Sequence, residues 1–304
     1  MSAFDLFVQQ IINGLVKGSL YAMIALGYTM VYGILGIINF AHGEVFMIGA
    51  MVAMTMTTLL LKMGLSSVLA LVLAVLVAMV ACMVVSFLIE RLAYRPLRHA
   101  PKLAPLITAI GMSFILQALV MLIWGREHLP FPEVLSAKRI SLFGSVGITE
   151  RELIIFAVAF VMMGGLFFLV NHTKLGRAMR ATSENVNVTA LMGVNPNRVI
   201  SATFMIGAAL AAVAGTLFAT NYGSKVHFYM GFIPGMKAFI AAVLGGIGNI
   251  PGALVGGLVL GLVESLGAGY ISSEYEDVFA FVVLVVVLIF RPSGLLGQRV
   301  ADRA

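Results

Sequence analysis

The sequence has very little charge. Only 11% of its 304 residues are Asp, Glu, Lys or Arg, whereas 61% are hydrophobic and the mean hydropathy is +1.06. A soluble globular chain is about one quarter charged and about half apolar. The composition therefore excludes an ordinary soluble domain and indicates a protein that lives in a lipid bilayer. We interpret the formal net charge of +6 as a signal for membrane orientation and expect no nucleic-acid partner.

Three further absences narrow the function. The single cysteine, Cys82, excludes a disulfide within the chain. No phosphate-binding G-x-x-x-x-G-K-[ST] motif occurs, so we expect this chain to bind no nucleotide or other cofactor. Any active pumping must then draw its energy from another polypeptide or from an ion gradient. Acidic residues within the apolar segments are few, which disfavours a proton- or sodium-coupled carrier.

Long apolar segments recur along the chain and predict an all-α, multi-pass membrane protein. Each is close to the length that an α-helix needs to cross hydrocarbon, about 20 residues. The N-terminal segment lacks a cleavage pattern, so we expect no removed signal peptide. Together with shorter segments they predict about eight or nine crossings in a single transmembrane domain over residues 1–304. The clearest segments lie near 66–89, 103–124, 152–170, 199–220 and 278–290.

The basic residues cluster in a way that predicts orientation. Segments 90–102 and 172–198 each hold four Arg or Lys, and the tail from Arg291 adds Arg299 and Arg303. The positive-inside rule places all three in the cytoplasm. The loop at about 125–152, which mixes both signs, then lies outside. This arrangement gives an external N-terminus and an internal C-terminus.

Two stretches are too rich in Gly and polar groups to form plain membrane helices. Residues 34–48 and 237–262 each run apolar, then Gly with Asn, then apolar again. Irregular backbone at membrane depth survives only when it is packed in protein or lines a cavity. We therefore predict broken or re-entrant segments at both places. Their shared character suggests a weak internal repeat with the transport pathway at its interface.

The polar cluster in "INFAHGE" leaves three interpretations open. Asn39, His42 and Glu44 could form a turn at the cytoplasmic interface, line or gate a pathway, or carry acid–base chemistry. Spacing gives no support to a metal site, because no second His or Cys lies at ligand distance along the chain. For a break here, Gly36 and Gly43 would permit the bend, and Asn39 and His42 would hydrogen-bond the freed backbone. Glu44 would then begin the next helix, where the dipole favours a carboxylate.

Gly-rich spacing dominates the second stretch. Four-residue spacing places small residues on one helix face and lets backbones approach closely. Packing is the first interpretation and pathway lining the second. Ala208, Ala211, Ala212, Gly215 and Ala219 form a similar face, interpreted as packing alone. We assign Gly246, Gly248 and Asn249 to a pathway or gate, and Gly252, Gly256, Gly257 and Gly261 to helix packing.

The basic stretch 172–198 contains a predicted short cytoplasmic helix. It would begin near Ser183, with Glu184 in its first turn, and end at Gly193. Its small apolar face would serve either to dock a soluble partner or to lie on the lipid surface. Glu264, an acid within an apolar run, is interpreted as a cap at the external end of its helix. The predicted apolar face consists of Val188, Leu191 and Met192.

Four stretches resemble a known family. Residues 27–50, 175–199 and 237–266, together with "ERLAYRPLR" at 90–98, are similar to the permease subunits of bacterial ATP-binding-cassette importers for branched-chain amino acids, in particular the LivH type. The resemblance covers nearly the whole chain. It implies the permease fold of such importers, in the inner membrane, and no covalent chemistry by this chain.

The resemblance also implies partners and a coupling site. Such a permease pairs with a second, LivM-type permease, two cytoplasmic ATPase subunits hydrolyse ATP, and a periplasmic binding protein delivers leucine, isoleucine or valine. Urea, short amides, sugars or other amino acids remain alternative cargoes, because related permeases carry them. A stand-alone channel, a gradient-driven carrier and an intramembrane hydrolase using His42 and Glu44 are rivals from other classes. The family's ATPase-coupling segment falls on Gly176, Arg177, Ala178, Arg180, Glu184, Ala190, Gly193 and Arg198.

Overall fold

The structure, a computed structural model, describes residues 2–98, 100–101, 103–143, 145–221 and 225–297. Seven helices in these ranges are long and apolar enough to cross a bilayer. The predicted all-α, multi-pass architecture is confirmed. The seven are α1 (Ala3–Leu35), α2 (His42–Lys62), α3 (Ser67–Ile89), α4 (Leu103–Trp124), α5 (Glu150–His172), α8 (Pro196–Asn221) and α10 (Ile250–Tyr270).

Two shorter apolar helices complete the bundle. They are α9 (Phe232–Gly245) and α11 (Glu276–Phe290), which follows the 3-10 turn η3 (Ser273–Tyr275). At 1.5 Å per residue, α9 is about 21 Å long, which is less than the hydrocarbon thickness of about 30 Å. Both predicted breaks are confirmed, because the chain leaves helical geometry between α1 and α2 and again between α9 and α10.

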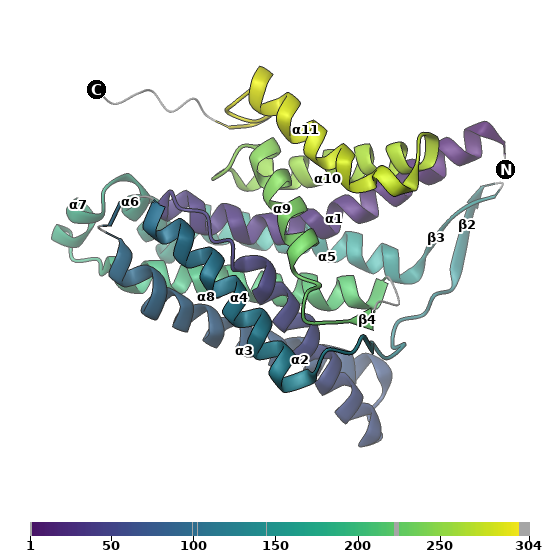
Figure 1. The fold of residues 1–304 in the computed structure, drawn as a ribbon, viewed down its shortest axis with the longest axis horizontal. Coiled ribbons are helices and arrows are strands. Elements are labelled where there is room, and N and C mark those ends of the chain that lie inside the picture. The colour runs from purple at the N-terminus through teal and green to yellow at the C-terminus, as the bar shows by residue number, and fades with distance from the viewer. Residues whose placement is uncertain (1, 99, 102, 144, 222–224, 298–304) are drawn as a thin grey trace.

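The two loops predicted on opposite sides of the membrane lie at opposite ends of the molecule (Figure 1). One end carries α6 (Lys174–Glu184) and α7 (Val186–Leu191), and we call it the α6–α7 end. The other carries strands β2 (Arg139–Phe143) and β3 (Val146–Thr149) beside the start of α1, and we call it the β2–β3 end. Arg299 and Arg303 lie outside the described residues.

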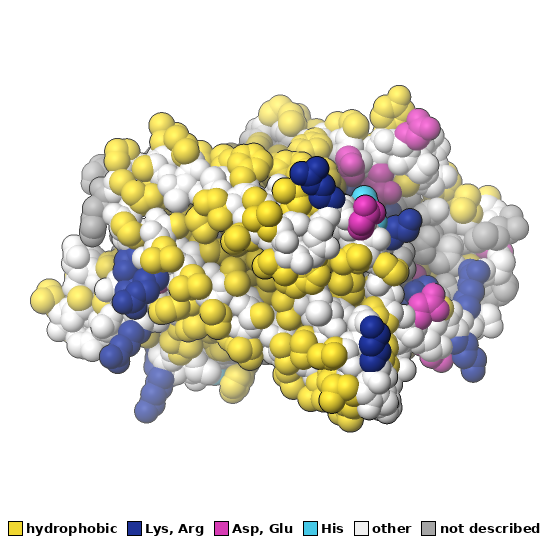
Figure 2. Space-filling model, turned by 60° about the horizontal axis from the view of Figure 1, so that its bottom comes forward, with side chains coloured by type: hydrophobic (Ala, Val, Ile, Leu, Met, Phe, Trp, Pro, Cys, Tyr) yellow, Lys and Arg dark blue, Asp and Glu magenta, His cyan; other side chains and the backbone are white. Residues whose placement is uncertain are grey.

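The basic segment after α3 belongs to the α6–α7 end. It forms a π-helical turn, η1 (Glu90–Tyr94), and a 3-10 turn, η2 (Arg95–Leu97). Arg98 donates to Asn197 in the first turn of α8 at 2.5 Å. Figure 2 shows an apolar band across the molecule, with Lys and Arg side chains on both sides of it and the acidic side chains toward the right. In this view the left end is basic, and the right end mixes both signs.

The loop between α4 and α5 contains strands that the sequence analysis did not predict. β2 and β3 form an antiparallel hairpin in which Ile140 pairs with Ile148. A second pair joins β1 (Leu129–Pro130) to β4 (Lys225–Val226), which precedes α9. β-Branched residues favour extended backbone, and here they occur in runs too short to stand out from an apolar sequence. The second pair ties two loops that are almost a hundred residues apart.

α1 is the central helix and packs most extensively against α10. A Cβ built on Gly18 would lie 2.7 Å from the carbonyl oxygen of Gly257, and one on Gly257 would lie 2.6 Å from the backbone nitrogen of Ala22. Gly14 meets Gly261 in the same way, one turn further toward the β2–β3 end. Real Cβ atoms do not approach backbone so closely, so the crossing requires glycine.

The neighbouring glycines of α10 face α9. A Cβ on Gly256 would collide with the carbonyl of Ala241, and one on Gly252 with that of Gly245. α10 therefore uses one glycine pair against α1 and another against α9. The small-residue face of α8 packs on α2 in a similar way, where Gly215 lies against the carbonyl of Phe46.

α4 packs lightly on the bundle through α2. Most of its large apolar side chains are exposed, and Trp124 is the only tryptophan of the chain. Its indole nitrogen donates to Thr55 Oγ1 of α2 at 2.8 Å. A polar contact therefore closes one end of the α2–α4 pair.

The glycine crossing of α1 with α10 yields a stability prediction. We expect Gly257→Leu to destabilise the protein strongly, because a branched side chain would displace the backbone of Ala22, and overpacking typically costs about 1–3 kcal/mol or more. Gly111→Leu on α4 is the matched control, since a Cβ there meets nothing within 4 Å. Thermal unfolding of purified protein, followed by size-exclusion fluorescence, measures both. Equal melting temperatures for the two variants would contradict the packing.

Candidate functional site

The break between α1 and α2 is built as a turn of the chain back into the bundle. α1 ends where Gly36 takes the left-handed conformation, with φ of 63°. Asn39 Oδ1 then accepts the backbone N–H of Ala41 at 3.1 Å and the hydroxyl of Tyr94 at 2.9 Å. Asn39 is 2% exposed. A buried side-chain oxygen thus satisfies backbone that the break sets free, as irregular structure at this depth requires.

His42 does not bond to the break, contrary to the expectation from sequence. Its ring lies against α1, with its centroid 4.8 Å from that of Tyr28 in an edge-on contact. The Nε2 atom sits over Gly27, where any Cβ would collide with it, and has no hydrogen-bond partner among the described residues. His42 is therefore a packing residue for α1 with one unused polar atom. It contacts the middle of α1, so α2 begins deep in the bundle.

Gly43 also differs from its expected use as a bending residue. It is helical, and a Cβ there would lie 2.6 Å from the carbonyl oxygen of Gly231 and 3.1 Å from the Cα of Gly235. The glycine allows the first turn of α2 to cross the start of α9 closely. The break therefore depends on Gly36 for its turn and on Gly43 for its crossing.

Glu44 lies in the first turn of α2 and faces α4. Its Oε1 accepts from Ser113 Oγ at 3.0 Å and from Gln117 Nε2 at 2.8 Å. Its Oε2 has no hydrogen-bond partner among the described residues, although the side chain is 1% exposed. The side chains of His42 and Glu44 thus point from α2 toward different helices, α1 and α4. They do not form the acid–base pair that a hydrolase would need.

The second break, between α9 and α10, uses the residues that the sequence analysis assigned to a pathway. Gly246 and Gly248 both have positive φ, 101° and 94°. Asn249 caps α10 by accepting the N–H of Gly252 at 3.0 Å, and its amide donates to the carbonyl of Leu296 at 2.7 Å. Gly248 lies beside Gly33 near the end of α1. The two breaks therefore flank the same end of α1.

A cavity of about 700 Å³ opens at the α6–α7 end, beside the second break. Gly248 and Asn249 line it, and Gly246 does not. Thr29 contributes a hydroxyl that is buried and has no partner among the described residues. Helix α6 lines the same cavity with Met179, Arg180 and Ser183. A pathway segment and the predicted coupling segment therefore share one space.

The predicted coupling segment forms two helices where one was expected. Glu184 is the last residue of α6, and α7 begins only after Asn185, whose side chain accepts the N–H groups of Asn187 and Val188. The prediction of Glu184 in the first turn of a helix is therefore wrong, because asparagine is the better cap. Gly193, with φ of 81°, follows the end of α7 as expected.

Two of the other predicted coupling residues, Gly176 and Arg180, fix α6 in place, and two residues of the predicted apolar face are exposed. Gly176 lies so close to the carbonyl of Val170 that no Cβ fits, and Arg180 donates to the same carbonyl at 2.5 Å. These contacts fix α6 to the end of α5. Leu191 and Met192, at 86% and 80% exposed, project from α7. The remaining members occupy α6, α7 and α8: Arg177, Ala178, Ala190 and Arg198.

Comparison with known proteins shows which family the sequence resembles. Residues 10–288 match the family model described as "Branched-chain amino acid transport system / permease component". A permease named BraD, of a high-affinity branched-chain amino acid transport system of Pseudomonas aeruginosa, is 49% identical over 296 residues and covers 96% of each chain. The permease named LivH of the corresponding Escherichia coli system is 47% identical and covers 97% of each chain.

The chain belongs to this permease family. A more distant relative is the permease named LivM of the Escherichia coli system, which is 28% identical over 151 residues, 49% of this chain and 35% of its own length. The chain is therefore a multi-pass membrane protein of a transport family.

One polar cluster of this permease was not recognised from its sequence. Lys237 of α9 is 7% exposed at its side chain and lies 3.1 Å from Glu264 and 2.6 Å from Asp277. Tyr21 of α1 donates to Glu264 at 2.8 Å. Glu264 is thus fully buried within α10, so its interpretation as a helix cap is wrong. Lys17 and Glu276 form a neighbouring pair at 2.8 Å.

The available signal for this cluster was Lys237 itself. A lysine within an apolar run is costly unless an acid reaches it, and Glu264 is the acid of the next apolar run. The pairing spans three helices, α9, α10 and α11. Sequence spacing alone does not bring them together.

Removing the lysine tests this buried network. Lys237→Met should lower stability by about 3–5 kcal/mol, because Glu264 would remain buried without its counter-charge. The double variant Lys237→Met/Glu264→Gln should regain much of that loss, since no buried charge is left. Thermal unfolding in detergent measures both.

Lys17→Met provides the matched control for this prediction. Its partner Glu276 is 27% exposed at the side chain, so water screens the pair and the cost should be about 1 kcal/mol or less. A double variant no more stable than Lys237→Met would contradict the buried-charge argument.

Proposed function

We propose that this chain is a permease subunit of an ATP-binding-cassette importer that moves leucine, isoleucine and valine across the bacterial inner membrane. The observation that carries the proposal is near-full-length similarity, at 47–49% identity, to permeases named for branched-chain amino acid transport. On this proposal the chain performs no covalent chemistry. It supplies part of a pathway that opens alternately to each side.

The proposal includes four partners. A second, LivM-type permease would complete the pathway, a periplasmic binding protein would deliver the amino acid, and two cytoplasmic ATPases would supply energy. The exposed apolar tip of α7 supports an ATPase contact, because Leu191 and Met192 are covered by nothing among the described residues. Arg177 in the neighbouring α6 is also exposed. A small apolar knob beside basic groups suits a soluble protein partner.

Coupling to the pathway would run through α6. This helix is fixed to the end of α5 through Gly176 and Arg180, and it lines the cavity that Gly248 and Asn249 also line. A displacement of α6 by an ATPase would therefore change the shape of that cavity. We assign the cavity to the cytoplasmic side of the pathway.

Deeper in the bundle, the two breaks supply the elements of a gate. Glu44 and its partners Ser113 and Gln117 hold α4 against the start of α2 by hydrogen bonds. Asn39 holds the turn that precedes them. Hydrogen bonds between helices can exchange partners at modest cost, about 1 kcal/mol each, which suits a joint that moves during transport.

Transport by the assembled complex tests the proposal. The chain is co-expressed with a LivM-type permease and two ATPases from the same gene neighbourhood, reconstituted in proteoliposomes and supplied with the binding protein. ATP-dependent uptake of labelled leucine, with no uptake of labelled urea, is the expected result. Urea uptake without leucine uptake would assign the chain to another cargo, and uptake without ATP would support a channel or carrier.

The gate assignment predicts a selective loss in Glu44→Gln. We expect leucine uptake to fall about tenfold, because a neutral amide oxygen accepts weaker hydrogen bonds from Ser113 and Gln117 than a carboxylate does, and an amide nitrogen would replace the buried Oε2, which has no partner among the described residues. Binding of the delivery protein to the complex should remain unchanged. Glu274→Gln, the same change at an exposed acid, is the control. Wild-type uptake in Glu44→Gln would reduce the cluster to a structural turn.

The exposed tip of α7 predicts a loss of ATPase binding. Leu191→Asp should weaken co-purification of the ATPases with the permease, because it places a charge at the centre of the proposed apolar contact. Leu191→Met should retain it. Both variants should melt like wild type, since the side chain is 86% exposed. Undiminished ATPase recovery with Leu191→Asp would refute the contact.

A further inference from the structure

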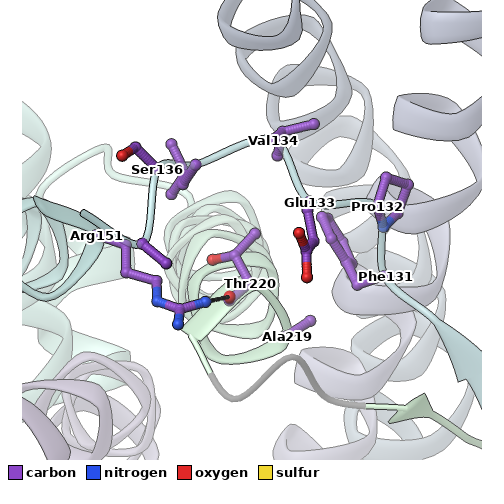
Figure 3. A pocket seen from close by; sticks show the side chains of 10 residues that line it. Phe131, Pro132, Glu133, Val134, Ser136, Arg151, Ala219 and Thr220 are labelled. Atoms are coloured by element: carbon purple, nitrogen blue, oxygen red, sulfur yellow. Dashed lines mark hydrogen bonds between the residues drawn. The ribbon is translucent and has the colours of Figure 1, made fainter. Parts of the chain in front are cut away.

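A second cavity lies near the β2–β3 end, under the loop between α4 and α5. It has a volume of about 300 Å³, and Figure 3 shows the side chains that line it. Residues 131–137 of the loop form its roof, the start of α5 contributes Arg151, and the end of α8 contributes Ala219 and Thr220. It is thus separate from the polar clusters and from the cavity at the α6–α7 end.

Two opposite charges face this cavity without pairing to each other. Figure 3 shows Glu133 and Arg151 entering from different sides, with Thr220 between them. Arg151 donates to the carbonyl oxygen of Thr220 at a long 3.4 Å, and neither side chain takes part in a salt bridge within the described residues. A carboxylate and a guanidinium held apart in one pocket leave room for a ligand that bears both complementary charges.

Apart from Ser136 and Thr220, the remaining lining residues are apolar. Phe131 and Val134 are buried at 6% and 8% exposure, and Ala219 is fully buried. Pockets for small molecules combine such walls with a few oriented polar groups, and their volumes begin near 300 Å³. The size, the two charges and the apolar walls together describe a site for a small zwitterion with an aliphatic side chain.

The cavity is also connected to the candidate gate. Its roof follows β1, which pairs with β4, and Leu129 lies opposite Val226 in that pair. The chain then continues from β4 to Gly231, which crosses Gly43 at the start of α2. A ligand that orders the roof would therefore act on the segment next to Glu44.

We propose that this cavity binds the zwitterion of an apolar amino acid at the external mouth of the pathway. Arg151 would hold the carboxylate, Glu133 the ammonium group, and Phe131 and Val134 the side chain. The inference rests on the proposed function, since it makes the cavity the first site that receives cargo from the delivery protein.

Direct binding tests the cavity independently of transport. Saturation-transfer NMR is recorded on the assembled complex in nanodiscs, without the delivery protein, with leucine as the probe. Arg151→Gln and Glu133→Gln should each weaken leucine binding about tenfold, the usual effect of deleting a charge-assisted hydrogen bond. Arg126→Gln and Glu127→Gln are matched controls, because they make the same changes at residues of the same loop that do not line the cavity. Both controls should bind leucine like wild type.

Ligands that carry only one of the two charges separate recognition from folding. Isoamylamine lacks the carboxylate, so its binding should fall in Glu133→Gln and stay unchanged in Arg151→Gln. The acid 4-methylvalerate lacks the ammonium group and should show the opposite dependence. Equal weakening of both ligands in either variant would overturn the assignment of the two roles.

Two further outcomes would overturn the proposal. Leucine binding equal to wild type in both variants, in a complex that transports leucine, would exclude the cavity as a cargo site. If the two variants lost binding to the delivery protein but still bound leucine, the cavity would be a binding site for the delivery protein. Failure of wild-type complex to transport leucine would instead count against the proposed function, while the NMR comparison would still decide what the cavity binds.

Discussion

The backbone-to-backbone crossing of α1 with α10 is the contact on which the other parts depend. In a bilayer, apolar side chains gain little by leaving lipid for protein, so helices associate through close van der Waals packing. Gly18 and Gly257 bring the two helix axes together, and Gly256 brings α9 against the other side of α10. Both helix breaks are attached to this three-helix unit. Their geometry therefore depends on residues that have no side chain.

Around this unit, polar groups are distributed in pairs that span neighbouring helices. Glu44 joins α2 to α4, and Glu264 joins α10 to α9 and α1. Glu44 lies at the boundary between the packed helix α2 and the largely exposed helix α4, whereas Glu264 lies within the unit of α1, α9 and α10. An ionisable group in hydrocarbon must find partners within the protein. Glu44 consequently marks the attachment of a peripheral helix, and Glu264 links the three central helices.

Sequence predicted the architecture and the breaks well, because both follow from local composition. Long apolar runs give membrane helices, and Gly with Asn between such runs gives a break. The direction of side chains could not be predicted in the same way. His42 was expected to bond the turn that precedes it, and it packs on Tyr28 instead. Lys237 forms ion pairs with Glu264 and Asp277, which lie on other helices. Such pairings depend on packing angles that no spacing along one helix contains.

The contact of Trp124 with Thr55 gives the chain a built-in optical probe. Since the sequence has one tryptophan, the indole emission of this chain comes from a single place. That place is the α2–α4 pair, the same pair that Glu44 and Gln117 join deeper in the bundle. Separation of α4 from α2 would break the indole hydrogen bond and change the polarity around the ring. The emission maximum therefore reports the opening of one helix pair, in the native sequence and without an added dye.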